Sequence, residues 1–365
     1  MVTLISRLKD KNKNNTEPLV SILVLNYNGK RFLKDCFDSL QKSAYPNYEI
    51  IMIDNKSTDD SVDFTKKIYP EIKIIQTHSN GGYSRAYNHA FESADGKYFV
   101  LLNNDVIVEK NWLEPLVEAA EEDHTIAALQ PKIRSLIEKD YFDYAGASGG
   151  YMDKYGYPFL RGRIFYTIEK DETQYNTEAE VFWTSGAAMF LRAEALTKSG
   201  PLDEDFFLHM EEIDLCWRLN LLGYKLKVIP KSVIYHYAGG TLKAESYGKL
   251  YWNHRNGWIT LIKNLEKGNL LKVSVVRYLL DVLNLLYAGF IQFDPAHAYA
   301  ILKSHVWILF HLKFLLKKRK LVQDIRVKSD SDISHLVYQK ALVFAYFFRK
   351  KKTFQSLGFR ADKIG

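Results

Sequence analysis

The stretch FVLLNNDVIVEKNW, residues 99–112, begins with apolar residues and then reaches Asn103, Asn104 and Asp105. An apolar run of this length is typical of a strand buried on both faces of a parallel sheet. Ligands of such sheets bind beyond the carboxyl ends of the strands. The stretch therefore predicts a core strand whose polar end faces a binding site. The alternative is that the three polar residues cap a turn before a helix near Asn111.

Three earlier apolar runs have the same character, and they lie at residues 20–28, 48–54 and 72–77. The segments between the runs carry apolar residues at helical spacing, as in KRFLKDCFDSLQK at residues 30–42. Strands that alternate with helices in this way form βαβ units. We therefore expect an α/β fold with a Rossmann-like, mostly parallel central sheet and helices on both faces.

The composition is that of a globular protein. The chain has 365 residues, of which 47% are hydrophobic and 25% charged, so we expect a large core and exclude general disorder. Cys36 and Cys216 are the two cysteines, and both occupy apolar positions of helical patterns. We expect two buried thiols in a reducing compartment. Residues 1–17 have no apolar core of signal-peptide length and are expected to form a flexible lead.

Charge is divided unevenly along the chain. Residues 263–365 hold 19 Lys and Arg against 7 Asp and Glu, whereas residues 1–262 hold 31 against 36. A basic tail on an acidic body favours an anionic partner, and a membrane surface is the partner that we expect. No nucleic-acid partner is expected.

Two long apolar segments, residues 270–293 and 297–320, are expected to be helices. Each is long enough to cross a bilayer, but charged residues such as Arg277, Asp281 and Lys303 interrupt them. We expect helices that pack on the rest of the chain and lie in the membrane interface. The basic residues expected to face anionic headgroups are Lys317, Lys318, Arg319 and Lys320. The alternative is a solvated basic helix end without membrane contact. A long irregular segment that covers the site is expected at residues 140–165.

Six motifs follow one another in a characteristic order: SILVLNYNG, DNKSTDDS, NGGYSRAYNHAF, LLNND, SGAAMFLR and EEIDLCWRLNLLGYKLKVIP. Together they resemble the family 2 glycosyltransferases, which have the GT-A fold. Within that family the chain is most similar to bacterial rhamnosyltransferase-type enzymes of surface-polysaccharide synthesis. The resemblance implies a GT-A domain at residues 18–262, and the composition of residues 263–365 predicts a basic, apolar, helical region after it.

The resemblance also implies an activity. The enzyme would move a sugar, with rhamnose as one candidate, from a nucleotide-diphosphate donor to a saccharide or lipid-linked saccharide, with inversion and with Mg²⁺ or Mn²⁺. The basic tail suggests a peripheral location at the inner, cytoplasmic face of the membrane. Nucleotidyl transfer is an alternative, although NYNGKRF is only a faint triphosphate loop. A non-catalytic nucleotide-sugar-binding protein is the other alternative.

A single carboxylate, Asp105, is the predicted metal ligand at the end of the buried strand. Hard oxygen ligands suit Mg²⁺ and Mn²⁺. The family often has two acids here, and this chain has Asn103 at the first position. The resemblance makes His236 a second candidate ligand, followed by Gly239 and Gly240, where backbone can approach a ligand closely. The alternative for His236 is a satisfied core histidine.

Residues at the other predicted strand ends are assigned to the donor, some by resemblance and others because they lie beside Asp54 or at a helix N-terminus that favours anions. Asp54 is expected to accept a hydrogen bond from the nucleobase, with helix capping as the alternative. Gly186 and Ala187 are expected to face the donor sugar, with close packing of strand on helix as the alternative. The remaining residues expected to bind the donor are Asn26, Asn28, Asn80, Gly81, Arg85 and Asn104.

The acceptor hydroxyl must lose a proton as it attacks, which requires a carboxylate base. Residues 211–214, EEID, place three acids at the start of a predicted helix. The resemblance indicates Glu212 as the catalytic base, and Glu211 stays open as the other catalytic candidate because the family usually has Asp at the second place. Asp214 is expected to orient the helix start or to bond Arg218 one turn later. A plain acidic helix N-terminus is the remaining alternative.

Overall fold

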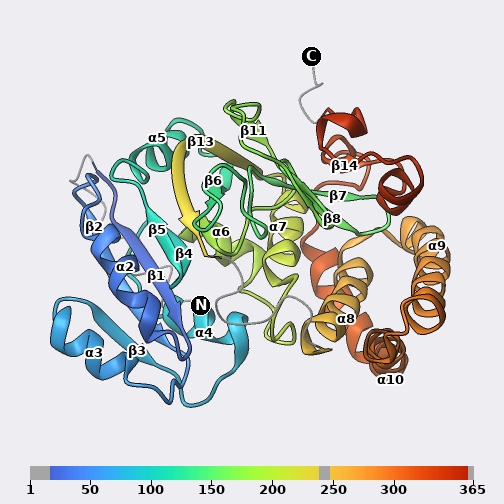
Figure 1. Cartoon of the computed structure of the whole chain (residues 1–365), viewed down its shortest axis with the longest axis horizontal. Helices are drawn as coiled ribbons and strands as arrows, with labels where there is room; N and C mark the ends of the chain where they lie inside the picture. Colours follow the sequence, from blue (N-terminus) through green and yellow to red (C-terminus); the bar gives the residue numbers. More distant parts are fainter. Residues whose placement is uncertain (1–16, 238–246, 361–365) are drawn as a thin grey trace.

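The computed structural model describes residues 17–237 and 247–360. The expected lead therefore lies almost wholly outside the described residues, as do the glycines after His236. The four predicted apolar runs form parallel neighbouring strands in the order β4-β1-β2-β3 (Figure 1). They are β1 (Val20–Asn26), β2 (Tyr48–Asp54), β3 (Lys73–Gln76) and β4 (Tyr98–Asn103). The prediction of a parallel core sheet is confirmed at these strands.

The central sheet has nine strands within the described part of the chain, in the order β11-β13-β6-β12-β4-β1-β2-β3, with β5 pairing with β13. The added strands are β5 (Val106–Val108), β6 (Ile126–Ser135), β11 (Ala179–Glu180), β12 (Ala188–Arg192) and β13 (Lys225–His236). β12 runs antiparallel between β4 and β6, whereas β13 runs parallel to β6. The sheet is therefore mixed but mostly parallel, which confirms the predicted fold class.

Helices cover both faces of this sheet because successive strand residues point to opposite sides. In β1, Leu23 belongs to one buried cluster and Val24 to the other. The Val24 cluster includes Phe37 of α2, and the Leu23 cluster includes Tyr87 of α4. The helices are α2 (Lys30–Leu40), α3 (Ser61–Ile68), α4 (Gly82–Phe91), α5 (Glu114–Glu122), α6 (Ala193–Ser199) and α7 (Glu211–Leu221).

A second, smaller sheet corrects one prediction. Residues 140–165 are not irregular throughout, because the segment contributes β7, β8 and β9 to a sheet with the order β10-β9-β8-β7-β14. These strands are β7 (Gly150–Asp153), β8 (Pro158–Leu160), β9 (Arg163–Ile164), β10 (Thr167–Ile168) and β14 (Val337–Tyr338). They are too short to show a clear alternating pattern in the sequence. β14 comes from the C-terminal region and pairs in parallel with β7.

The C-terminal helices lie together on the side of the molecule away from β3 (Figure 1). They are α8 (Tyr247–Asn264), α9 (Lys267–Leu286), the π-helical turn η1 (Tyr287–Ile291) and α10 (Pro295–Ile325). Three short turns follow, at Ser334–Leu336, Phe344–Phe348 and Gln355–Leu357. α8 packs against both α7 and α10, so it joins the sheet domain to the long helices. The division of the chain at residue 262 stays a prediction.

The basic cluster near the end of α10 is only partly as predicted. Lys318 forms ion pairs with Asp203 and Asp205. Arg319 donates hydrogen bonds from Nη1 to the carbonyls of Ile262, at 2.7 Å, and Leu265. The expectation that both side chains face headgroups is therefore wrong, because acids and backbone carbonyls of the protein itself pair with them. Their neighbours Lys317 and Lys320 are exposed.

Candidate active site

Two of the predicted site residues meet where β4 ends and β13 ends. Asp105 lies in the two-residue link between β4 and β5, and β5 pairs with β13 so that Val106 lies opposite His236. The His236 Nε2 atom lies 3.1 Å from Asp105 Oδ1. Asn103 Nδ2 lies 3.3 Å from the same imidazole nitrogen. The structure thus brings together the two candidate metal ligands and the asparagine that occupies the place of a second acid.

A third residue, Asp143, completes this cluster. Its Oδ1 atom lies 3.1 Å from His236 Nδ1, so the imidazole lies between two buried carboxylates. Burial acts to lower the pKa of His236, but the charges of Asp143 and Asp105 outweigh it and raise that pKa well above its ordinary value. Burial likewise opposes ionisation of Asp105, yet His236 holds the pKa of its carboxyl below the ordinary value. Asp143 has no strand-end signature in the sequence and was missed.

The nitrogen and oxygen atoms of this cluster are of the kinds that bind a divalent cation. An imidazole nitrogen and a carboxylate oxygen already lie 3.1 Å apart, and a carboxylate on the far ring nitrogen orients such a ligand. Asp143 Oδ2 is buried and has no hydrogen-bond partner among the described residues. No group of three or more His, Cys, Asp or Glu arranged for a metal occurs in the described ranges. Asp105 and His236 are thus two candidate ligands, a number that would suit a cation that is shared with phosphate oxygens.

Two buried asparagine side chains connect Asp54 to this cluster by hydrogen bonds. Asp54 ends β2 next to Asn26 of β1, and Asn26 Nδ2 lies 3.4 Å from Asp54 Oδ1. Asn26 Oδ1 in turn accepts a hydrogen bond from Asn104 Nδ2 at 2.7 Å. All three side chains are buried. The structure therefore connects the predicted base-binding carboxylate to the residue that precedes Asp105.

The other predicted asparagines hold loops. Asn28 has a left-handed φ of 51°, and its Oδ1 accepts a hydrogen bond from the Thr58 N–H at 2.7 Å. Asn80 Oδ1 accepts hydrogen bonds from Asn55 Nδ2, at 3.0 Å, and from the Gly82 N–H, at 3.1 Å. These contacts fix the backbone before α3 and before α4. Their direct role toward a donor stays a prediction.

Gly81 and Arg85 lie at the start of α4. The Gly81 N–H donates to Asn55 Oδ1 at 3.3 Å, so this amide is already used inside the protein. Arg85 Nε pairs with Glu204 Oε2 at 3.2 Å, and both side chains are largely exposed. They line a hollow of about 390 Å³ that contains neither Asp105 nor His236. The structure does not bring Arg85 to the acid–histidine cluster.

Gly186 and Ala187 lie directly before β12, next to the end of β4. The Ala187 carbonyl accepts a hydrogen bond from the Asn103 N–H at 3.1 Å. The Gly186 carbonyl accepts one from the Tyr83 hydroxyl at 2.8 Å, and a Cβ atom at Gly186 would lie only 2.8 Å from that hydroxyl. Close packing therefore requires glycine here, which supports the packing alternative without removing the predicted contact with a donor.

The two glutamates at the start of α7 are the least compensated acids of the site. Glu211 is buried, and Oε2 of both Glu211 and Glu212 is buried without a hydrogen-bond partner among the described residues. Burial raises the pKa of Glu212 to about 7. Burial and the charge of Glu212 raise the pKa of Glu211 well above its ordinary value. A carboxylate with a pKa near 7 suits proton transfer at neutral pH.

The third acid of the motif behaves differently. Asp214 Oδ2 accepts hydrogen bonds from Arg218 Nε, at 3.0 Å, and from Lys263 Nζ, at 2.8 Å. Asn264 Nδ2 donates to its other oxygen at 2.9 Å. The predicted bond to Arg218 is confirmed, and the carboxylate is fully paired inside the protein.

Tyr83 of α4 connects the glutamates to Gly186. Its N–H donates to the Phe207 carbonyl at 2.9 Å, and its hydroxyl donates to the Gly186 carbonyl. Burial, together with nearby charges that include Glu211 and Glu212, raises the pKa of the Tyr83 hydroxyl well above its ordinary value. The pair of glutamates and the start of β12 therefore lie around the same side chain.

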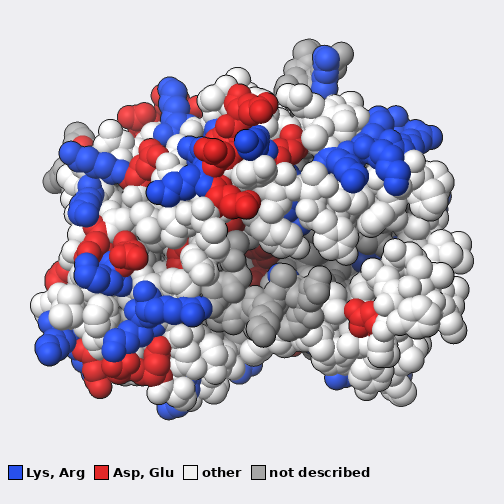
Figure 2. All heavy atoms as spheres, in the orientation of Figure 1, with Lys and Arg blue, Asp and Glu red and all other residues white. Residues whose placement is uncertain are grey.

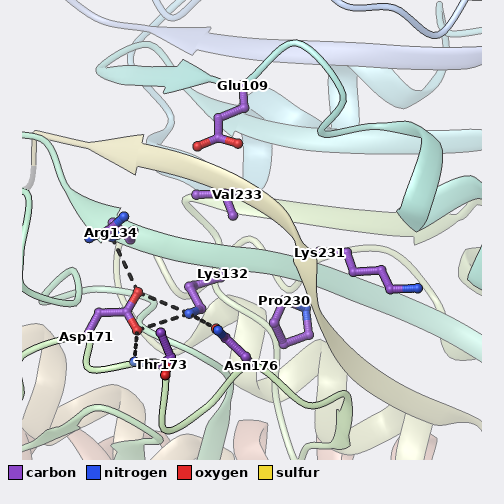
Figure 3. A pocket seen from close by; sticks show the side chains of 9 residues that line it. All are labelled: Glu109, Lys132, Arg134, Asp171, Thr173, Asn176, Pro230, Lys231 and Val233. Carbon is purple, nitrogen blue, oxygen red and sulfur yellow. Dashed lines mark hydrogen bonds and ion pairs between the residues drawn. The ribbon is translucent and has the colours of Figure 1, made fainter.

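A separate hollow of about 420 Å³ lies along β6 and β13 (Figure 3). Its most buried cation, Lys132, lies within 3.1 Å of both carboxylate oxygens of Asp171 and also donates to Asn176. Lys132 is therefore neutralised inside the protein. None of the predicted site residues lines this hollow.

Comparison with known proteins gives the family. Residues 21–196 match the model of the family described as "Glycosyl transferase family 2". The chain is 24% identical over 261 residues to the N-acetylglucosaminyl-diphospho-decaprenol L-rhamnosyltransferase of Mycobacterium tuberculosis strain H37Rv, which covers 67% of this chain and 84% of that protein. It is 24% identical over 233 residues to the rhamnosyltransferase WbbL of Escherichia coli K12, which covers 60% of this chain and 84% of WbbL.

Solved structures support the fold. The structure of GalNAc-T7 with UDP, GalNAc and Mn²⁺ superposes with a TM-score of 0.57 at 16% identity, over 82% of this chain and 58% of that one. Staphylococcus aureus TarS in complex with UDP-GlcNAc superposes with a TM-score of 0.51 at 16% identity, over 78% of this chain and 81% of that one. The sheet topology, the matched region and these neighbours agree: residues 21–196 form a glycosyl transferase family 2 domain, and the described chain has a GT-A-like fold.

Proposed function

We propose that this protein is an inverting, metal-dependent glycosyltransferase of cell-surface polysaccharide synthesis. The observation that carries the proposal is the contrast between two acidic groups at one end of the sheet. Asp105 is paired with a buried histidine, whereas one buried oxygen of Glu212 has no partner among the described residues and burial raises the pKa of this carboxyl to about 7. The first arrangement suits a cation and a diphosphate, and the second suits an acceptor proton.

Glu212 is the base in this proposal. The acceptor hydroxyl oxygen attacks the anomeric carbon of the donor sugar, and its proton passes to the Glu212 carboxylate. The bond between the anomeric carbon and the diphosphate oxygen breaks with its electron pair on the leaving diphosphate. One displacement from the opposite face gives inversion. Glu211, which is buried beside Glu212, raises the proton affinity of the pair.

Asp105 and His236 would hold a Mg²⁺ or Mn²⁺ ion, and Asp143 would orient His236 through its other ring nitrogen. Such an ion supplies charge stabilisation for the leaving diphosphate. The lone carboxylate makes the protein depend on the nucleotide for tight binding of the ion. Asp54 and Asn26 are assigned to the nucleoside, because Asn104 connects them to the end of β4.

The donor and acceptor are proposed from the relatives. Both relatives named above are rhamnosyltransferases, which favours a nucleotide-diphosphate rhamnose as donor. The mycobacterial relative is named for a lipid-linked acceptor, N-acetylglucosaminyl-diphospho-decaprenol. We therefore assign a lipid-linked saccharide to this chain as its acceptor. A GT-A-like neighbour solved with UDP and Mn²⁺ supports Mn²⁺ as the first ion to test.

A donor screen tests the proposal. Thermal unfolding would be followed with Mn²⁺ and each of thymidine-diphosphate rhamnose, UDP-GlcNAc and GDP-mannose, because selective binding raises the melting temperature. We expect the rhamnose donor to stabilise the protein most and to be slowly hydrolysed. Release of the sugar as the opposite anomer would confirm inversion. Stabilisation by none of the three donors would contradict the proposal.

The C-terminal helices support a peripheral location at the inner face of the cytoplasmic membrane. Within the described residues, Lys267–Ile291 and Pro295–Ile325 are long and apolar enough to cross a bilayer. Figure 2 shows little charge over α9 and α10 on the face drawn, whereas Lys, Arg, Asp and Glu mix over α2 and α3. The most exposed apolar side chains of these helices and of the link between them include Leu271, Phe290, Phe293, Leu309, Phe310 and Leu321, which we call the apolar helix surface.

We propose that this surface enters the headgroup region while Lys317 and Lys320 meet anionic lipids. Vesicles of phosphatidylcholine with and without phosphatidylglycerol would be floated with the protein. We expect Phe310→Glu to release it, because Phe310 is 84% exposed. Ile68→Glu on α3, which is also an exposed apolar position, is the matched control and should leave binding unchanged. Equal recovery of Phe310→Glu and of the unaltered protein would contradict the membrane assignment.

A further inference from the structure

The backbone directly before the two glutamates is held in an uncommon conformation. His209 and Met210 both have left-handed φ values, 69° and 74°, although neither is glycine. Such a conformation costs free energy and persists only where surrounding contacts hold it. Glu211 begins α7 immediately afterwards. The position of both glutamates therefore depends on whatever fixes this turn.

A single buried side chain of α8 holds the turn. Asn256 Nδ2 donates hydrogen bonds to the Leu208 carbonyl, at 2.8 Å, and to the His209 carbonyl, at 2.7 Å. The Asn256 side chain is fully buried, and its Oδ1 accepts a hydrogen bond from Arg255 Nε at 2.9 Å. Both amide hydrogens and the amide oxygen are thus used. The orientation of this amide is set by its neighbours, so it acts as a fixed clamp on the turn.

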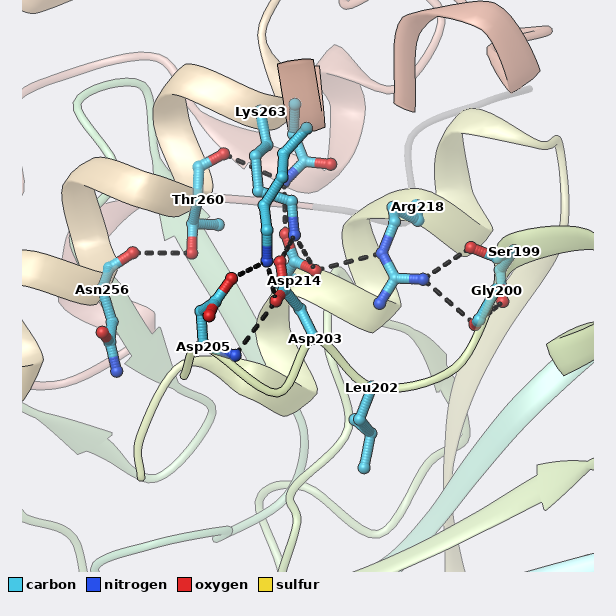
Figure 4. Close-up of polar contacts among 12 residues, drawn as sticks. Ser199, Gly200, Leu202, Asp203, Asp205, Asp214, Arg218, Asn256, Thr260 and Lys263 are labelled. Atoms are coloured by element: carbon cyan, nitrogen blue, oxygen red, sulfur yellow. Dashed lines mark hydrogen bonds and ion pairs between the residues drawn. The ribbon is translucent and has the colours of Figure 1, made fainter. Parts of the chain in front are cut away.

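A network of charges, buried at Lys263 and Asp214 and partly exposed at Lys318 and Asp205, fastens the flanks of the same turn to α8 and α10 (Figure 4). Lys263 of α8 bridges Asp203, at 2.6 Å, and Asp214 of α7, at 2.8 Å. Lys318 of α10 pairs with Asp203 and Asp205. The network thus attaches residues on both sides of the clamped turn, before it at 203–205 and after it at 214. Removal of one partner from the buried part of this network leaves a charge uncompensated.

We propose that Asn256 is a positioning residue for the catalytic glutamates, and that α8 and α10 together form the support on which the base is mounted. This inference rests on the proposed function, in which Glu212 accepts the proton. It assigns a role in transfer to helices that follow the family's matched region, residues 21–196. Misplacement of a catalytic group by about 1 Å can cost a hundredfold in rate.

Kinetics of Asn256→Ala test the proposal with the donor that the unaltered protein turns over fastest. We expect kcat to fall about 10- to 100-fold, with the KM for the donor changed less than threefold. We also expect the acidic limb of the pH profile to move, because the surroundings of Glu212 change. Asn256→Asp should act alike, because a carboxylate cannot donate to two carbonyls. Asn253→Ala, an exposed asparagine three residues earlier, is the matched control.

Hydrogen exchange of backbone amides gives a second measurement that does not depend on activity. We expect residues 207–212 to exchange at least tenfold faster in Asn256→Ala than in Asn253→Ala, while the sheet stays protected. If Asn256→Ala does not fold, Lys318→Met replaces it in both experiments, because Lys263 still pairs with Asp203 after that substitution.

The outcomes separate this inference from the proposed function. Normal kcat, or a lower kcat with an unmoved pH profile and unchanged exchange at residues 207–212, would overturn the role of Asn256. If Glu212→Gln keeps full activity, the base assignment fails, whatever Asn256 does. Faster exchange together with normal kcat would also reject the positioning role, because the turn would then be mobile without consequence for transfer.

Discussion

Two groups of acids in this protein have opposite electrostatic surroundings. Asp105 and Asp143 lie on either side of His236, and each carboxylate has a nitrogen partner at 3.1 Å. Glu211 and Glu212 lie side by side at the start of α7, each with a buried oxygen that lacks a partner among the described residues. The surroundings thus lower the pKa of the carboxyl group at Asp105 and raise it at Glu212.

The difference shows how burial acts on a carboxyl group. Burial opposes charge at both places, but at Asp105 the cation of His236 outweighs it and the pKa falls. At Glu212 no cation compensates, and the pKa rises to about 7. In many active sites, pairs of titratable groups have pKa values that their surroundings shift in opposite directions, and the two groups then have different roles in the reaction. In the proposed function, the Asp105 group holds a cation and the Glu212 group accepts a proton.

Replacing the proposed base should have the largest effect. Glu212→Gln keeps the shape of the side chain but cannot accept a proton, so we expect kcat to fall about 10³- to 10⁴-fold. Donor binding, measured by thermal shift with Mn²⁺, should stay as it is. Glu211→Gln should retain more activity than Glu212→Gln. The reverse ranking would make Glu211 the base, and near-normal activity in both variants would remove the contrast between the two acidic groups.

Replacing Asp105, the proposed metal ligand, should have the second-largest effect on activity. Asp105→Asn removes the one negative ligand at the end of β4, and we expect activity at fixed Mn²⁺ to fall about 10²- to 10³-fold. Excess Mn²⁺ should recover part of this loss, because the diphosphate still binds the ion. Titration of Mn²⁺ against activity measures both quantities. Insensitivity of the variant to Mn²⁺ concentration, with full activity, would contradict a metal role for Asp105.

Much of this comparison was predictable from the sequence, because Asp105 and His236 lie at strand ends and the two glutamates lie at the start of a helix. The runs that became β1 to β4, the apolar face of α2, and the bond from Asp214 to Arg218 follow local patterns of period and spacing. These patterns place Asp105 and Glu212 correctly on their elements. They do not measure burial, so the high pKa of Glu212 needed the structure.

Other parts depend on contacts between distant segments, which no local pattern records. Asp143 reaches His236 across 93 positions of the chain, and Asn256 reaches His209 across 47. α10 is apolar almost all round, so its sequence could not show that Lys318 turns inward to Asp203. The small sheet around β7 was missed because its strands have two to four residues.

Asp143 offers a sharper test of the charged group than Asp105 does, because it contacts the histidine and not the predicted ion. Asp143→Asn keeps a hydrogen-bond acceptor but removes the charge that favours the orientation and basicity of His236. We expect the affinity for Mn²⁺ to fall about 10- to 100-fold. Saturating Mn²⁺ should restore most of the activity. Asp140→Asn, on the same segment, is the control, and unchanged Mn²⁺ affinity in Asp143→Asn would reject the orienting role.

The smallest expected effect is on stability. It tests the raised pKa of Glu212 without any substrate. The folded pKa of Glu212 is about 7, above the value of about 4.3 for an exposed glutamate, so its stabilising contribution is present below about pH 4.3 and is lost as pH rises through 7. Glu212→Gln removes this loss. We expect its melting temperature to match that of the unaltered protein near pH 4.5 and to exceed it by about 2–4 °C at pH 8.

Glu194→Gln, at an exposed position of α6, should show no such trend. A difference that stays constant from pH 4.5 to 8 would mean that Glu212 is not held as a weak acid, and the division between the two acidic groups would then lose its physical basis.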